Sequence, residues 1–139
     1  MMAGTVMTMY PATVTSRATI AEVMDLMCAR NVRHIPVVER GALVGMLSDR
    51  DLVRLGVTTV VTDGSIETLE RTLATPASSV MRSGVITVQP ETGLREVVGL
   101  LLENRASAIP VVHPDTNAVL GIVSYLDVLR AVKKRLEGD

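Results

Sequence analysis

The sequence contains one pattern twice, and this repeat constrains the possible folds more than any other feature. The stretch VGMLSDRDLVR begins at Val44 and LGIVSYLDVLR begins at Leu120, and both place Gly, Ser, Asp and Arg at the same intervals. IPVV precedes each stretch, at positions 35 and 109, and Val-Met occurs earlier still, at positions 6 and 80. The chain is therefore expected to contain two copies of one structural unit.

Each copy is predicted to contain a strand, a helix, a hairpin of two strands and a final helix. The runs ATVT and VITV are typical of strands, and ERGA and HPDTNA supply the turn residues of the hairpins. The fold class is therefore α/β (α+β), with a three-stranded sheet in each unit. A domain of ~60 residues is marginal alone, so the two sheets are expected to pack together. The predicted domains are 1–57 and 76–139, joined by a linker at 58–75. SIETLERTLA favours a short helix in this connection, and ATPASS, which follows it, favours a loop.

Apolar residues recur every three or four positions over residues 20–28 and 94–102, which predicts an amphipathic helix in each copy. Thr19 and Glu22 form a capping-box pattern at the start of the first helix, whereas Gly93 stands at the corresponding place in the second. Cys28 lies on the apolar stripe and is expected to be buried and unreactive.

Composition excludes several classes of function. The 139 residues are 47% hydrophobic with a net charge of −1, and two Tyr residues are the only aromatic side chains, so nucleic-acid binding is not expected. No apolar run approaches the roughly 20 residues that span a bilayer, and the N-terminus does not have a secretion-signal pattern, so no membrane partner is expected. A single cysteine fits a reducing compartment, and a cytoplasmic location is expected.

Ser48 with Asp51, and Ser124 with Asp127, repeat a Ser-x-x-Asp spacing at the start of each final helix. In one interpretation the Ser caps the helix and the acid lies at its positive end. Capping leaves unexplained why a Gly precedes each Ser by three residues, and why Asp is used twice where longer acids reach further. In the other interpretation these residues form a ligand site, because helix N–H groups and a hydroxyl suit phosphate and a carboxylate can accept both hydroxyls of a ribose.

The whole pattern resembles a tandem pair of CBS domains, the module named after cystathionine β-synthase, of the stand-alone bacterial or archaeal type. The resemblance covers nearly the entire chain and rests on the VMT opening, VMRSGVITV, both IPVV strands, GMLSDRDL and GIVSYLDV. It implies a pseudo-twofold pair in which a cleft between the sheets holds up to two adenosine-containing ligands, such as AMP, ADP, ATP or S-adenosylmethionine. It implies no other required cofactor.

By position, the resemblance implies that Asp51 and Asp127 bind ribose and that Ser48 and Ser124 contact ribose or phosphate. The segments before the first helices, together with the IPVV strands, are implied to line the adenine; the candidates are Thr13, Thr15, Arg17, Ile35, Pro36, Thr87, Ile109 and Pro110.

The residues just before IPVV are implied to reach the phosphates, and here the copies differ. Arg33 and His34 precede the first IPVV, whereas Ser and Ala precede the second. Arg and His donate hydrogen bonds to phosphate, so the pocket facing them, hypothesised to be the one with Asp127, should prefer a charged nucleotide. Arg50 is a further phosphate candidate. The alternatives are a surface charge for Arg33, a structural role for His34 and a salt bridge to Asp49 for Arg50.

The leading hypothesis is a regulatory module that senses an adenosine ligand and signals to a protein partner, which the sequence does not identify. The alternative is a dimerising scaffold with degenerate ligand sites. No arrangement of residues resembles a catalytic dyad or triad, and no metal-ligand spacing is present, so neither an enzyme nor a metal site is expected. The resemblance also implies a homodimer. The final helix carries an apolar stripe that could either form the interface or cover its own sheet: Leu126, Leu129, Val132 and Leu136.

Overall fold

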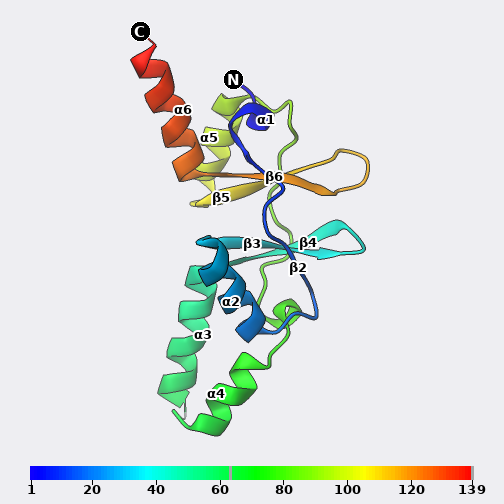
Figure 1. Ribbon diagram of the computed structural model, residues 1–139, viewed down its shortest axis with the longest axis vertical. Helices are drawn as coiled ribbons and strands as arrows, with labels where there is room; N and C mark the ends of the chain where they lie inside the picture. The colour runs from blue at the N-terminus through cyan, green and yellow to red at the C-terminus, as the bar shows by residue number, and fades with distance from the viewer. Residues whose placement is uncertain (63, 139) are drawn as a thin grey trace. The chain divides into compact units, whose positions relative to one another are not determined.

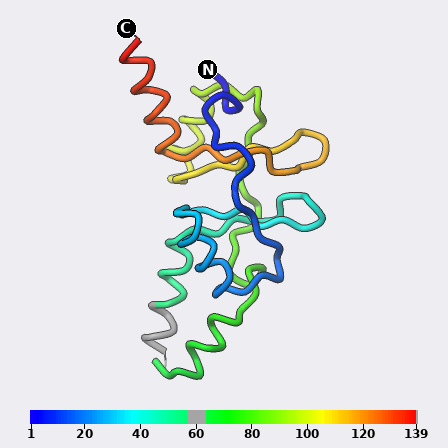
Figure 2. Tube along the Cα trace, viewed as in Figure 1, coloured from blue at the N-terminus to red at the C-terminus, as the bar shows by residue number. Residues whose placement is uncertain are grey.

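The computed structural model describes residues 1–62 and 64–138, which divide into two compact units. Unit 1 combines residues 1–11 with the chain from position 86 onward, and unit 2 consists of residues 12–85. The chain therefore starts in unit 1, enters unit 2 after Pro11 and returns after Val85 (Figure 2). Each unit is built from most of one repeat and the opening segment of the other.

Unit 2 contains a three-stranded sheet in the order β2-β3-β4, formed by β2 (Val14–Thr15), β3 (His34–Glu39) and β4 (Ala42–Ser48). β2 runs parallel to β3, and β3 and β4 form the predicted antiparallel hairpin. The helices α2 (Ile20–Arg30) and α3 (Asp49–Thr62) lie on one face of this sheet (Figure 1).

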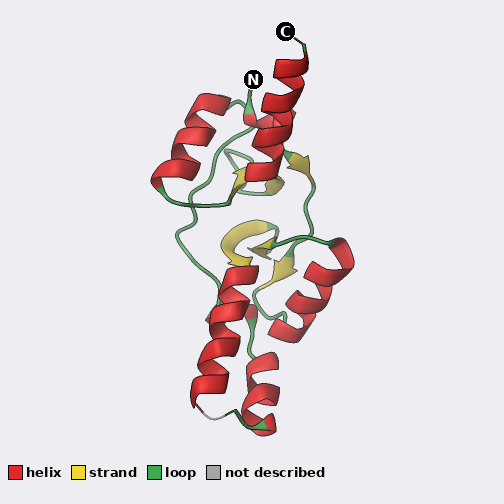
Figure 3. Cartoon of the chain, turned by 90° about the vertical axis from the view of Figure 1, so that its left-hand side faces the viewer, coloured by secondary structure: helices red, strands yellow, loops and turns green. Residues whose placement is uncertain are grey.

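Unit 1 repeats this arrangement with a different third strand. Its sheet has the order β1-β6-β5, formed by β1 (Thr8–Met9), β6 (Val119–Ser124) and β5 (Ala108–Val112). β1 comes from the opening segment of the first repeat and pairs antiparallel with β6. The helices α5 (Leu94–Glu103) and α6 (Tyr125–Glu137) lie on one face of this sheet (Figure 3).

The remaining elements are short. Helix α1 spans Ala3–Val6 and α4 spans Ile66–Leu73, so the helix predicted in the linker is confirmed. The 3₁₀ helix η1 (Ala77–Ser79) occupies part of ATPASS, where a loop was predicted. The strand predicted over VITV is reduced to one bridge, because the pairing with β5 is confined to Val88. Within residues 1–62 and 64–138, no helix has the length and apolar character needed to cross a membrane.

The prediction that Cys28 is buried is wrong. The buried face of α2 is formed by Ile20, Val23 and Met27, whereas Cys28 is exposed. Successive residues of a helix are rotated by ~100°, so the residue after Met27 lies at the flank of the stripe rather than at its centre. The Thr19 side chain accepts the predicted capping hydrogen bond from the Glu22 N–H.

The stripe on α6 does not cover its own sheet. Its members are 42–69% exposed: Leu126, Leu129, Val132 and Leu136. Val128 packs against the core of unit 1 instead. The alternative in which the stripe covers the sheet is therefore wrong, and unit 1 presents an apolar helix face to solvent.

The opening segment of each repeat completes the core of the unit that contains most of the other repeat. Ala3 is fully buried in the core of unit 1, and Ala77, at the equivalent repeat position, is fully buried in unit 2. The following methionines, Met7 and Met81, pack against the same two cores. Because these contacts join residues far apart in sequence, each unit depends on both repeats.

The glycine three residues before each Ser is a close-packing position. A Cβ atom at Gly45 would contact Met81 Sδ and lie 2.8 Å from Met81 Cγ and 3.0 Å from the Arg82 carbonyl oxygen. A Cβ atom at Gly121 would contact Met7 Sδ and lie 2.9 Å from the Thr8 carbonyl oxygen. These distances are shorter than nearly all Cβ contacts, so a side chain at either glycine would force the docked methionine or the backbone behind it to shift.

We therefore expect Gly121→Ala to destabilise the fold by about 1–3 kcal/mol, because the added methyl group overpacks the contact with Met7 and the backbone of Thr8. Gly99→Ala is the matched control. A Cβ at this position inside α5 meets nothing within 4 Å, so the substitution should stabilise by about 0.5–1 kcal/mol through helix propensity. Urea unfolding monitored by circular dichroism measures both. Equal midpoints for Gly121→Ala and the wild type would contradict this account of the contact.

Candidate functional site

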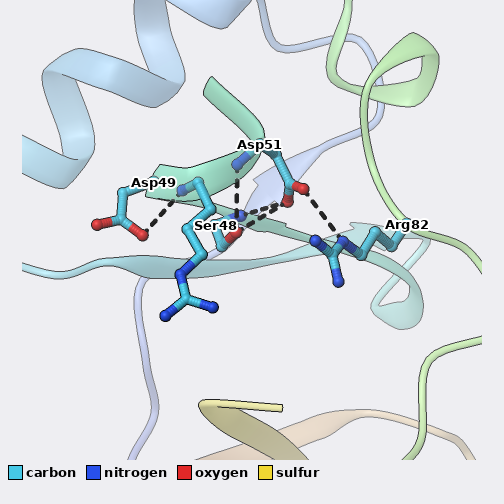
Figure 4. Close-up of polar contacts among 5 residues, drawn as sticks. Ser48, Asp49, Asp51 and Arg82 are labelled. Atoms are coloured by element: carbon cyan, nitrogen blue, oxygen red, sulfur yellow. Dashed lines mark hydrogen bonds and ion pairs between the residues drawn. The ribbon is translucent and has the colours of Figure 1, made fainter. Parts of the chain in front are cut away.

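The start of α3 is capped by the predicted Ser-Asp pair. The N–H and hydroxyl of Ser48 donate to Asp51 Oδ2, at 2.9 and 3.0 Å, and the Asp51 N–H points back to Ser48 Oγ at 3.4 Å (Figure 4). Asp51 is 8% exposed. The short acid suffices here because one carboxylate oxygen reaches both donors of the same Ser.

The start of α6 repeats this geometry. The N–H and hydroxyl of Ser124 donate to Asp127 Oδ2, at 2.8 and 3.0 Å, and the Asp127 N–H donates to Ser124 Oγ at 3.3 Å. Asp127 is 7% exposed. The capping interpretation is therefore confirmed in both copies, and the capping bonds hold each carboxylate in one orientation.

The other oxygen of each carboxylate binds the opening segment of the other repeat. Arg82 Nε donates to Asp51 Oδ1 at 3.1 Å, and Thr8 Oγ1 donates to Asp127 Oδ1 at 3.0 Å. Sequence reasoning assigned no function to Arg82 or Thr8. The available signal was their shared position, because each residue directly follows the repeated Val-Met.

Each capping carboxylate retains some capacity to accept a further hydrogen bond. A carboxylate has about four acceptor positions. Within the part of the chain that the structure describes, Asp51 and Asp127 each accept three hydrogen bonds, so about one position remains on each. Capping and ligand binding are thus compatible, but an incoming hydroxyl must share Oδ1 with Arg82 or with Thr8.

The charged phosphate candidates gather in unit 2 near the start of α3. The Asp49 N–H donates to the Arg33 carbonyl oxygen at 2.9 Å, which ties the residue before β3 to the helix. Arg50 meets Asp49 through its backbone N–H, which donates to Asp49 Oδ1 at 2.9 Å, rather than through the salt bridge considered above. The Arg33 and Arg50 side chains are both exposed.

His34 begins β3 opposite Ser48 and is half-buried. Burial lowers the pKa of His34 below the ordinary value of 6.5. The carboxylates of Asp49 and Asp51 act in the opposite direction, because they favour the protonated imidazole, but their effect is smaller than that of burial. The guanidinium groups of Arg50 and Arg33 lower the pKa further. The imidazole is therefore neutral at pH 7.

The structure separates the adenine candidates into two groups. Ile35 and Ile109 belong to the hydrophobic cores of their units, and the neighbouring prolines of the IPVV strands are fully buried: Pro36 and Pro110. The others are exposed or half-buried on the segments around β2 and before Val88: Thr13, Thr15, Arg17 and Thr87. Ser16, within the first segment, donates from its N–H and its hydroxyl to Glu39 Oε1, which anchors that segment to the end of β3.

His, Cys, Asp and Glu side chains do not gather in groups of three or more anywhere in residues 1–62 and 64–138, so these residues form no candidate metal centre. Cys28 is exposed on α2 and is not disulfide-bonded. Within each unit, the structure gathers polar donors around the capping carboxylate.

Comparison with known proteins identifies the family. The CBS domain family matches residues 3–58 and 77–134. The CBS domain-containing protein YhcV of Bacillus subtilis is 37% identical over 122 residues, which cover 88% of this chain and 79% of YhcV. The chain therefore belongs to the CBS domain family and carries two copies of the domain.

Solved structures agree with this assignment. The crystal structure of CBSX2 in complex with AMP is 25% identical in sequence, with a TM-score of 0.80 and coverage of 96% of both chains. A CBS domain-containing protein from Thermotoga maritima is also 25% identical, with a TM-score of 0.77 and coverage of 96% of this chain and 95% of that one. Four further curated relatives are longer proteins, and this chain spans 21–54% of their lengths.

The lowered pKa of His34 makes stability depend on pH. The folded state binds a proton less readily than the unfolded chain, so stability falls as pH drops below 6.5 toward the folded-state pKa. When the pH is lowered from about 7.5 to 5.5, we expect the free energy of unfolding to fall more for the wild type than for His34→Gln. The difference between the two losses should be less than about 1.4 kcal/mol per pH unit. Urea unfolding at each pH measures this difference.

His113→Gln is the matched control, because His113 lies in the turn between β5 and β6 and its replacement leaves His34 in place. This variant should keep the extra loss of stability. Parallel pH profiles for the wild type and His34→Gln would show that burial of His34 does not oppose its protonation.

Proposed function

We propose that this CBS pair is a regulatory module that binds an adenosine-containing ligand and signals its presence to a protein partner. The candidate ligands are AMP, ADP, ATP and S-adenosylmethionine. The observation that carries the proposal is a buried carboxylate at two helix starts, each fixed by a Ser and each with about one acceptor position left. The likeness to CBSX2, solved with AMP, supports the adenosine chemistry.

The proposed roles follow from the chemistry of each group. Asp127 accepts a hydrogen bond from a ribose hydroxyl, and Ser124 holds the carboxylate in place for it. The N–H groups and the positive end of the dipole at the start of α6 favour a phosphate or carboxylate group. In unit 2, Arg33 and His34 remain the proposed phosphate contacts, because a guanidinium gives two parallel donors and a neutral imidazole N–H gives one.

A ligand changes the behaviour of the module only through its different affinity for two conformations. Each unit contains an opening segment from the other repeat, and Thr8 on one such segment bonds directly to Asp127. A ligand hydroxyl at Asp127 therefore competes with, or adds to, a contact that holds this segment. We propose that this competition links ligand binding to a change in conformation. The proposed domain boundaries, 1–57 and 76–139, are supported by the family matches at 3–58 and 77–134.

The second candidate function is a dimerising scaffold, and the exposed face of α6 favours it. Leu126, Leu129 and Leu136 are 60–69% exposed on this helix and face away from the core that Val128 joins. Contiguous apolar surface of this kind is typical of protein interfaces. A homodimer through α6 is compatible with ligand binding, so the two functions can coexist.

Ligand binding is tested by thermal unfolding with adenosine, AMP, ATP and S-adenosylmethionine. A ligand at a hundred times its dissociation constant should stabilise the fold by about 2.7 kcal/mol and raise Tm by on the order of 5–10 °C. Asp127→Asn should remove the shift, because the amide presents a donor where the ribose needs an acceptor. Asp115→Asn, in an exposed turn, is the control and should retain the shift. No shift with any of these compounds would favour the scaffold.

Dimerisation is tested by sedimentation velocity at several protein concentrations. We expect the wild type to sediment as a dimer and Leu129→Glu with Leu136→Glu to sediment as a monomer, because burying two unpaired charges in an interface is strongly unfavourable. Ile66→Glu is the matched control: this residue is 75% exposed on α4 in the other unit. A dimer that survives the double substitution would place the interface elsewhere.

A further inference from the structure

The two capping carboxylates share their cap and their burial but differ in the group that bonds to Oδ1. Both accept two hydrogen bonds from their Ser on Oδ2, and both are buried to the same extent, at 8% and 7% exposed. They differ in the group that occupies Oδ1, which is the guanidinium of Arg82 for Asp51 and the hydroxyl of Thr8 for Asp127. Arg82 and Thr8 occupy equivalent repeat positions, so the two sites can be compared with the rest of the cap unchanged.

A guanidinium and a hydroxyl affect an incoming ribose differently. A guanidinium has donors only and stays charged, so it cannot accept a hydrogen bond from a ribose hydroxyl. Arg82 is 57% exposed and meets the buried Asp51 carboxylate from the solvent side, with full charge compensation. The Thr8 hydroxyl rotates, and it can donate to Asp127 while accepting from a ribose hydroxyl. A ribose hydroxyl can therefore bond to both members of the Thr8–Asp127 pair, whereas at Asp51 it competes with the Arg82 guanidinium for Oδ1.

A second difference makes the N–H groups at the start of α3 less available to a phosphate. The residue after Ser48 is Asp49, and its carboxylate already accepts the N–H of Arg50 at 2.9 Å. An anion at the start of α3 would meet this carboxylate and compete with it for the N–H. At the equivalent place in α6 stands Tyr125, which has no carboxylate, so the start of α6 remains suited to an anion.

The Asp127 carboxylate also has a cation near it. Arg130 Nη1 lies 3.7 Å from Asp127 Oδ1, beyond hydrogen-bond distance, and its side chain is 72% exposed. Arg54 stands at the equivalent position in α3. An arginine therefore follows each carboxylate by one helical turn. Among the residues that the structure describes, an arginine hydrogen-bonded to Oδ1 is present at the Asp51 site, and Thr8 takes its place at the Asp127 site.

We infer that Arg82 acts as a built-in occupant of the Asp51 site, so that the chain binds one adenosine ligand, at Asp127, rather than two. This inference rests on the proposed function. Arg82 is a specificity-determining residue in this scheme, because it decides which of two equivalent carboxylates is open to a ribose. The second site is present in the fold and is closed by one side chain.

The test is the number of adenosine or AMP molecules bound per chain, measured by isothermal titration calorimetry on the full chain. The wild type should bind one molecule, Asp127→Asn should bind none, and Asp51→Asn should still bind one. Arg82→Thr, which copies the residue of the other repeat, should bind two, and combining it with Asp51→Asn should return the number to one. Arg82→Lys keeps a cation at this position and should still bind one.

The reciprocal substitutions provide the control. Thr8→Arg should close the Asp127 site and abolish binding, whereas Thr8→Ser keeps a hydroxyl and should bind as the wild type does. Circular dichroism melting without ligand establishes that each variant is folded.

Three outcomes would overturn the inference in distinguishable ways. Two molecules bound by the wild type, or one bound by folded Arg82→Thr, would overturn it and leave the proposed function standing. Weaker binding of AMP, but not of adenosine, by Arg82→Thr would show instead that Arg82 contacts the phosphate. Absence of binding by every variant and by the wild type would remove the proposed function together with the inference.

Discussion

The structure depends on the docking of a short Val-Met segment from each repeat onto a glycine-containing strand of the other. Gly45 and Gly121 let Met81 and Met7 approach the sheets, and the backbone behind each methionine then pairs with the same strand. A side chain at either glycine would occupy the space of the methionine. Because each unit borrows this segment, a single repeat lacks part of its own core, and the two halves of the sequence fold as mutually dependent parts.

The same docking brings the functional candidates into place. The residue after each methionine reaches the carboxylate that caps the last helix, through Arg82 at Asp51 and through Thr8 at Asp127. The capping Ser fixes one carboxylate oxygen, and the docked segment controls the other. The cap thus uses one oxygen of the carboxylate, and the proposed ligand contact would use the other. A capping role and a binding role are compatible for this reason, although the sequence alone presents them as competing interpretations.

The repeat also explains how the surroundings of two equivalent carboxylates can differ without any change of fold. Duplication preserves the backbone, the cap and the burial of the acid, and the two sites then diverge through the residues that surround it. Arg82 neutralises one carboxylate, while Asp49 occupies a helix N–H beside it. His34, held neutral at pH 7 by burial, adds a donor to the same unit without adding charge. The start of α3 in unit 2 therefore carries an acid and a base, Asp49 and Arg50, whereas the start of α6 in unit 1 has an exposed aromatic and an exposed apolar residue at the same places.

The sequence by itself determined the repeat, the hairpins, the amphipathic helices and the Ser-Asp caps, because these depend on spacing along a few turns or strands. Its single-residue errors have the same origin: Cys28 lies just beyond the centre of a stripe that periodicity locates only to within a residue. Only the tertiary structure decided why the glycines are there, which carboxylate meets Arg82 and which meets Thr8, and that the α6 stripe faces solvent. The carboxylate contacts join residues 31 and 119 positions apart, and no local pattern encodes which distant segment supplies the partner.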